Sequence, residues 1–160
     1  MNTKPKPRII LLAEDDPDDI YLIGEAIDES GLDITLYLVQ DGDELLDYLY
    51  HRGKYADPQE APRPDLILLD LNMPRKDGRT ALAEIKADPG MRGIPVVVLT
   101  TSSAQDDLDR SYASGSSGFV TKPASFKALR EVIAKIGEYW LGTVRLPEEP
   151  PYGEGKRKED

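Results

Sequence analysis

Short apolar runs alternate five times with stretches of helical periodicity along this chain. The runs span residues 9–13, 34–39, 66–69, 94–99 and 118–121. Continuous apolar runs of this length are typical of strands buried on both faces of a parallel sheet. Between and after them, apolar residues recur at intervals of three and four, most clearly in the stripe Phe126, Leu129, Ile133, Ile136 and Trp140. The order predicts an α/β fold in which a five-stranded parallel sheet is doubly wound with five helices.

Turn residues and composition divide the chain into three parts. Asp16-Pro17 is typical of a helix start, with Asp16 as the cap. Residues 53–64 contain three prolines and predict a long loop before the third strand. After Leu141 the sequence becomes rich in proline, glycine and charge. We therefore expect an N-terminal arm over residues 1–7, one domain over 8–141, and an extension over 142–160 that is mobile beyond Pro150.

The composition excludes several classes of protein. The chain has 30 acidic residues against 20 Lys and Arg, a net charge of -10, which opposes binding to nucleic acid or to anionic membranes. It contains no cysteine, which excludes disulfides, thiolate nucleophiles and zinc–cysteine sites. No apolar run approaches the roughly 20 residues that span a bilayer, and no signal peptide is visible. We expect an acidic, cytoplasmic protein.

Polar residues gather at the carboxyl ends of the predicted strands, where an open parallel sheet binds its ligands. Three carboxylates close together cannot all ionise without a countercharge, and all-oxygen ligands favour Mg²⁺ or Mn²⁺. Each group alone has an ordinary explanation as a helix cap, a loop start or a turn. Their joint placement predicts a metal-assisted site. The residues are carboxylates after the first and third strands, hydroxyls after the fourth and a lysine after the fifth: Glu14, Asp15, Asp16, Asp70, Thr100, Thr101, Ser102 and Lys122.

The motifs at these strand ends resemble the receiver domain of two-component response regulators. They are LLAEDD at 11–16, LILLDLNMPRKDG at 66–78, VVVLTTS at 96–102 and GFVTKP at 118–123. The resemblance covers roughly residues 8–141 and implies the CheY-like, flavodoxin-like (βα)5 fold. It also implies a phosphoprotein that catalyses its own phosphorylation and dephosphorylation without being a turnover enzyme, and that switches a protein-interaction surface.

The resemblance implies a phosphoacceptor and a magnesium site. Asp70 would accept the phosphoryl group. Asp15 and Asp70 would bind Mg²⁺ directly, with Mn²⁺ as a possible substitute. Glu14 would act through water, and the backbone carbonyl of Asn72 would complete the protein ligands. Glu14 departs from the commoner Asp at its position and is longer by one methylene.

The same resemblance implies a switch. The Thr100 hydroxyl would turn toward a new phosphoryl oxygen and vacate space into which Phe119 turns. Phe119 replaces the Tyr that is often found there and has no hydroxyl. Lys122 would be the family's lysine, a point charge for a phosphate oxygen or for Asp70. We expect the Lys122-Pro123 peptide to be cis, which would aim the lysine inward.

Less specific features of the sequence predict the partners. No output domain follows the last predicted helix, so we expect a stand-alone receiver. The motifs DLNMPRKDGR and VVVLTTSSAQDD, the proline-rich loop and the pair Tyr139-Trp140 resemble small regulators paired with phytochromes. The expected partner is a sensor histidine kinase, a bacteriophytochrome. Tyr139, Trp140 and the following LGTVRLP segment predict the interface of a two-fold homodimer. The alternative is that both aromatics cap the core and the tail folds back over them.

Other functions are open to different degrees. A haloacid dehalogenase-like phosphatase needs an acid two residues after its aspartate, and Asn72 is an amide. An FMN binder needs a phosphate loop where this chain has EDDPDD. The alternatives that remain are a phosphorelay intermediate, a chemotaxis-type regulator of a non-phytochrome kinase, and an interaction domain that is not phosphorylated. His51, the sole histidine, is expected to sit at a helix C-terminus rather than to carry phosphate.

Overall fold

The computed structural model describes residues 7–147, in which five strands form one sheet. The strand order is β2-β1-β3-β4-β5, and every pair is parallel. The predicted five-stranded parallel sheet is therefore confirmed. The expectations for residues 1–6 and 148–160, including mobility beyond Pro150, concern residues outside the described part of the chain. The strands are β1 (Arg8–Ala13), β2 (Ile34–Val39), β3 (Leu66–Leu69), β4 (Val96–Thr100) and β5 (Gly118–Thr121).

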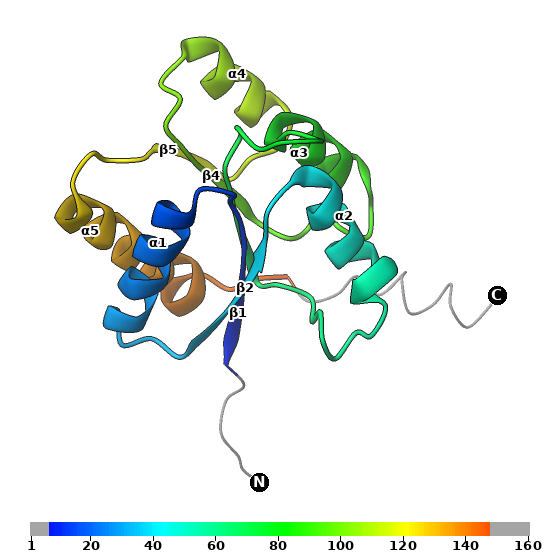
Figure 1. Ribbon diagram of the computed structural model, residues 1–160, viewed down its shortest axis with the longest axis horizontal. Coiled ribbons are helices and arrows are strands. Elements are labelled where there is room, and N and C mark those ends of the chain that lie inside the picture. Colours follow the sequence, from blue (N-terminus) through cyan, green and yellow to red (C-terminus); the bar gives the residue numbers. More distant parts are fainter. Residues whose placement is uncertain (1–6, 148–160) are drawn as a thin grey trace, which may run out of the picture.

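Five α-helices cover the two faces of the sheet (Figure 1). α1 and α5 lie side by side on one face, and α2 and α3 lie on the other, with α4 next to α3 (Figure 1). A π-helical turn, Glu138–Thr143, continues α5. Among the described residues, no helix is long and apolar enough to cross a membrane. The helices are α1 (Pro17–Glu29), α2 (Gly42–Tyr50), α3 (Gly78–Ala87), α4 (Gln105–Ala113) and α5 (Phe126–Gly137).

The sheet separates two apolar clusters because successive strand residues point to opposite faces. On β1, Leu11 and Ala13 join the cluster beneath α2 and α3, whereas Ile10 and Leu12 join the cluster beneath α1 and α5. β3 and β4 alternate in the same way and are buried throughout. Burial on both faces explains why these strands are continuous apolar runs in the sequence.

Side-chain caps fix where four of the helices begin. Asp16, Asp41, Asp77 and Ser125 each accept a hydrogen bond from a backbone amide in the first turn of α1, α2, α3 and α5. Such caps satisfy amides that have no partner within the helix. The cap at Asp16 is the one predicted from Asp16-Pro17. Because these helices start directly after the strand-end loops, the caps also fix the loops that carry the polar residues.

Three details differ from the sequence-based expectations or refine them. β4 begins at Val96 rather than at residue 94, because Pro95 has no amide hydrogen to donate to a ladder. The expected cis Lys122-Pro123 peptide is wrong, since every peptide bond of the described residues is trans. Lys122 nevertheless points inward, since only 6% of its side chain is exposed. His51 ends α2 in the left-handed region (φ 57°), and its Nε2 lies 2.8 Å from the carbonyl oxygen of Ala61.

Candidate functional site

Three carboxylates meet at the carboxyl ends of β1 and β3. Ala13 pairs with Leu69, so the residues that follow them, Glu14 and Asp70, leave the sheet side by side. One carboxylate oxygen of each of Glu14, Asp15 and Asp70 lies within 4.8 Å of the others. Glu14 and Asp70 are buried, at 1% and 6% exposure, whereas Asp15 is exposed. The cluster is therefore closed on the protein side and open to solvent at Asp15.

Lys122 points into this cluster from the end of β5. Its Nζ donates hydrogen bonds of 2.7 Å to Glu14 Oε1 and to Asp19 Oδ2, and lies 3.5 Å from Asp70 Oδ2. The backbone N–H of Lys122 donates to the carbonyl of Thr100 at 2.7 Å, which fixes the start of the side chain. Only 6% of the lysine side chain is exposed. The strand ends of β1, β3 and β5 thus supply one compact charged site.

The electrostatics of the cluster leave an excess of negative charge. Burial raises the pKa of Glu14 to about 7, and the hydrogen bond from Lys122 acts in the opposite direction. Burial opposes the charge of Lys122, but hydrogen bonds to Asp19 and Glu14 hold its pKa above the usual value. One lysine faces four carboxylates: Glu14, Asp15, Asp19 and Asp70. An all-oxygen donor set with uncompensated negative charge fits a hard divalent cation such as Mg²⁺ or Mn²⁺.

The loop after Asp70 packs tightly against the start of α3. The N–H of Gly78 donates to the carbonyl of Leu71 at 2.9 Å. A Cβ at Gly78 would collide with the backbone of Asp70 and Leu71, so only glycine allows this approach. Asn72, which is exposed, donates its N–H to Asp70 Oδ1 at 3.2 Å. Gly78 therefore positions the backbone that orients the Asp70 carboxylate.

The predicted switch residues lie on β4 and β5. Thr100 is fully buried at the end of β4, and its Oγ1 accepts a 3.3 Å hydrogen bond from the N–H of Ser102. Phe119 pairs with Val98 across the sheet and is half-buried against the cluster beneath α2 and α3. Pro123 follows Lys122 in the trans form and ends the strand. The structure thus brings Thr100 and Lys122 together at one edge of the sheet, joined by the backbone hydrogen bond described above.

Sequence reasoning missed two groups. Asp19 is part of the EDDPDD run, and it faces Lys122 because it lies in the first turn of α1, three residues after the Asp16 cap. Arg79 is the last residue of the motif DLNMPRKDGR, and it pairs with Asp107 of α4, the last residue of the motif VVVLTTSSAQDD. The signal for Asp19 was its helical spacing from the cap. Both residues lie in motifs noted in the sequence, but nothing in those motifs indicates that Arg79 and Asp107 pair across 28 positions.

Comparisons with known proteins show the family to which the chain belongs. Residues 10–134 match the family model described as the response regulator receiver domain. The chain is 44% identical over 141 residues to the response regulator Rcp1 of Synechocystis sp., covering 88% of this chain and 94% of that protein. It is 42% identical over 142 residues to the probable methanogenesis regulatory protein FilR2 of Methanothrix harundinacea, covering 88% of each.

Solved structures share the fold. The crystal structure of the phosphorylated cyanobacterial phytochrome response regulator RcpA superposes with a TM-score of 0.84 at 46% identity, covering 89% of this chain and all of that chain. The Mn²⁺-bound form of Rcp1 superposes with a TM-score of 0.82 at 44% identity and similar coverage. The family model spans most of the chain and the relatives are similar over nearly their whole length, so this chain belongs to the response regulator receiver family.

Proposed function

We propose that this chain is a response regulator receiver whose Asp70 accepts a phosphoryl group from a histidine kinase. The observation that carries the proposal is the convergence of Glu14, Asp15 and Asp70 with Lys122 at one sheet edge. In this proposal the receiver comprises residues 8–141, flanked by an arm over 1–7 and an extension over 142–160. The protein acts in the cytoplasm, without binding nucleic acid or membranes directly.

The chemistry requires an attacking carboxylate and a means of neutralising charge. An Asp70 oxygen attacks the phosphorus of the kinase's phosphohistidine; the new O–P bond forms as the N–P bond breaks, and the imidazole leaves. When bound, Mg²⁺ would neutralise the charge of the phosphoryl oxygens and of the carboxylates. Asp15 and Asp70 would hold it directly, the backbone carbonyl of Asn72 would add a ligand, and Glu14 would act through water. Lys122 supplies a positive charge to the same group, and the chain assists its own dephosphorylation by holding these residues in place.

The Thr100 hydroxyl passes the change to the surface. It lies at the strand end next to β5, where it can turn toward a phosphoryl oxygen on Asp70. Phe119 packs on the side of the sheet that carries α2 and α3, so an inward turn of its ring would repack that layer. Phosphorylation of Asp70 thereby changes the packing around α4 and β5.

We propose a phytochrome-type kinase as the partner, because Rcp1 and RcpA are similar to this chain over nearly its whole length. A phosphorelay or chemotaxis-type role for a non-phytochrome kinase is the alternative, and the similarity to FilR2 gives it some support. Phosphotransfer profiling against the purified histidine kinases of the source organism separates the two. Fastest transfer from a phytochrome-type kinase is expected, and preferential transfer from another kinase would contradict the pairing.

Asp15→Ala is expected to weaken Mg²⁺ binding by at least about tenfold, because it removes the solvent-facing carboxylate of the cluster. The matched control is Asp18→Ala, which removes an equal charge from the exposed first turn of α1. Isothermal titration calorimetry with Mg²⁺ measures both variants. Magnesium affinity that is equal in Asp15→Ala and in the control would refute the ligand role of Asp15.

We further propose a two-fold homodimer that uses the end of α5. The side chain of Tyr139 is 52% exposed and stands edge-on to Trp140, with ring centroids 5.2 Å apart. Trp140 and Leu146 are partly buried against the cluster beneath α1 and α5. Tyr139 is therefore the aromatic that is free to meet a partner, with Trp140 and the following segment beside it.

Tyr139→Ala combined with Trp140→Ala is expected to convert the dimer into a monomer. Analytical ultracentrifugation at micromolar concentration, with and without beryllofluoride as a phosphoryl mimic, measures the change. Glu138→Ala, on the exposed side of the same turn, is the control and should remain dimeric. A wild-type monomer in both states would refute the dimer, and a dimer that survives the double substitution would refute this interface.

A further inference from the structure

α4 is less firmly anchored to the rest of the domain than the other α-helices are. Ser111 is the buried residue of α4, whereas α3 buries Ala81, Leu82 and Ile85. α4 begins after Ala104 without a side-chain cap, although the other four α-helices have one. Apolar packing and capping therefore contribute little to the position of α4.

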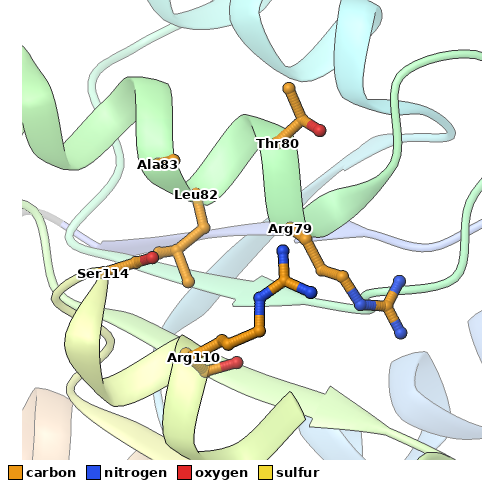
Figure 2. A pocket seen from close by; sticks show the side chains of 7 residues that line it. Arg79, Thr80, Leu82, Ala83, Arg110 and Ser114 are labelled. Atoms are coloured by element: carbon orange, nitrogen blue, oxygen red, sulfur yellow. The ribbon is translucent and has the colours of Figure 1, made fainter. Parts of the chain in front are cut away.

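A cavity of about 260 Å³ separates α3 from α4 (Figure 2). Arg79 extends from α3 and Arg110 from α4 over this space, and Leu82 and Ser114 face it (Figure 2). A gap of this size between two helices removes the dispersion contacts that would lock them together. The helix has room to change its position relative to α3.

One bidentate ion pair bridges the two helices beside this cavity. Arg79 Nε lies 2.7 Å from Asp107 Oδ1, and its Nη2 lies 2.8 Å from Asp107 Oδ2. Side-chain exposure is 27% for Arg79 and 13% for Asp107, so solvent screens the pair only in part. Hydrogen bonds from Arg79 and from Ser102 hold the pKa of Asp107 well below its usual value, so the carboxylate stays charged. Forked geometry of this kind fixes direction as well as distance.

The same guanidinium also reaches the loop that follows Asp70. Its Nη1 donates to the carbonyl of Leu71 at 3.4 Å, and its Nη2 donates to Asn72 Oδ1 at 3.3 Å. These two residues are the first after Asp70. Arg79 therefore contacts the phosphoacceptor loop and the first turn of α4 at once.

Asp107 receives a second connection from the switch. Ser102 Oγ donates to Asp107 Oδ2 at 2.7 Å, and the N–H of Ser102 donates to Thr100 Oγ1 at 3.3 Å. A turn of the Thr100 hydroxyl toward a phosphoryl group would move the oxygen that accepts the hydrogen bond from Ser102. Asp107 accepts hydrogen bonds both from Ser102, in this loop, and from Arg79, on α3.

We propose that Arg79 is a positioning residue that, through Asp107, couples the orientation of α4 to the state of Asp70. This inference rests on the proposed phosphorylation of Asp70. In the unphosphorylated protein the Arg79–Asp107 pair holds α4 in its observed place. On phosphorylation, movement of the Thr100–Ser102 loop strains or breaks the pair and frees α4.

Hydrogen exchange of the α4 amides in the full chain, without a phosphodonor, tests the holding role. Arg79→Ala and Asp107→Asn are each expected to accelerate exchange over Gln105–Ala113 about five- to tenfold, the loss expected for a charge-assisted pair that is only partly exposed. Combining the two substitutions should add little, because both remove one interaction. Arg110→Ala, which removes the same charge from the same cavity, is the matched control and should change exchange less than twofold.

Beryllofluoride with Mg²⁺ tests the coupling. It is expected to accelerate α4 exchange in the wild type and in Arg110→Ala, but to cause less than half of that change in Arg79→Ala, where α4 is already released. Arg79→Lys keeps the charge without the fork and should recover only part of the response. Equal basal exchange in Arg79→Ala and Arg110→Ala, or a full beryllofluoride response in Arg79→Ala, would overturn the role of Arg79.

The results that would refute the role of Arg79 can be distinguished from those that would refute the proposed function. A wild-type chain that acetyl phosphate cannot phosphorylate would refute the function of Asp70 and, with it, the coupling. A wild type that is phosphorylated, and whose α4 responds in the same way as that of Arg79→Ala, would refute the coupling alone.

Discussion

Asp70→Asn is expected to abolish phosphorylation of the chain, both by a phosphorylated histidine kinase and by acetyl phosphate. An amide oxygen is a much weaker nucleophile than a carboxylate, and the buried end of β3 places Asp70 opposite Glu14 and Asp15. Phosphate-affinity electrophoresis and peptide mass spectrometry of the labelled chain measure the loss. Asp18→Asn is the matched control, because it removes a neighbouring exposed carboxylate and should leave labelling unchanged.

The fold should survive this substitution, which separates chemistry from stability. The Asn72 N–H donates to Asp70 Oδ1, and an asparagine carbonyl oxygen can accept the same bond. Lys122 remains paired with Glu14 and Asp19. We expect the free energy of unfolding to change by no more than about 1 kcal/mol. Wild-type labelling of the folded variant, or label mapped to another residue, would show that Asp70 is not the acceptor.

Lys122→Ala is expected to cost about 3 kcal/mol of stability in metal-free protein at pH 8. Glu14 is 1% exposed, and the ammonium of Lys122 is its nearest positive charge among the contacts described above. Removing one partner of a buried ion pair leaves the other charge without compensation, which is more costly than losing an exposed pair. Urea denaturation in EDTA gives the free energy of unfolding. Lys135→Ala, on the exposed face of α5, is the control and should cost less than about 0.5 kcal/mol.

The cost of Lys122→Ala should depend on pH. The pKa of Glu14 is raised in the folded protein to about 7 from its ordinary 4.5, so its protonated form favours folding below pH 4.5 and this contribution is lost as pH rises through 7. Without Lys122 the hydrogen bond that lowers this pKa is gone, and the pKa rises further. Destabilisation should therefore be smaller at pH 5 than at pH 8. The same cost at both pH values would mean that Glu14 does not take up a proton in the variant.

The fold could be predicted because strands that are buried on both faces are continuous apolar runs in the sequence. β3 and β4 are apolar at every position or nearly so, and their ends define where polar residues can meet. The proximity of Glu14 and Asp70 could be predicted, since the carboxyl ends of parallel strands lie at the same edge of the sheet. The start of β4 was misplaced because residue 94 is apolar and buried but precedes a proline.

The remaining contacts depend on geometry that a linear pattern does not contain. Asp19 meets Lys122 only because α1 is rotated about its axis so that this side of its first turn faces β5. Arg79 meets Asp107 because the tight packing of Gly78 sets where α3 begins. Helix rotation and loop closure are tertiary properties, so spacing from a cap or membership of a motif does not by itself show which residues these side chains contact.

β5 is the strand that carries Phe119 and leads into Lys122. It forms the edge of the sheet and is hydrogen-bonded to β4 alone, and its residues alternate between layers: Phe119 packs beneath α2 and α3, and Val120 packs with α5. A shift of this strand therefore changes the packing of both helical layers. If phosphorylation and dimerisation both act on β5, they are thermodynamically linked, and reciprocity follows. If phosphorylation raises the affinity between two copies by some factor, dimerisation raises the equilibrium constant for phosphorylation by the same factor. The response to a kinase will therefore depend on the concentration of the regulator in the cell.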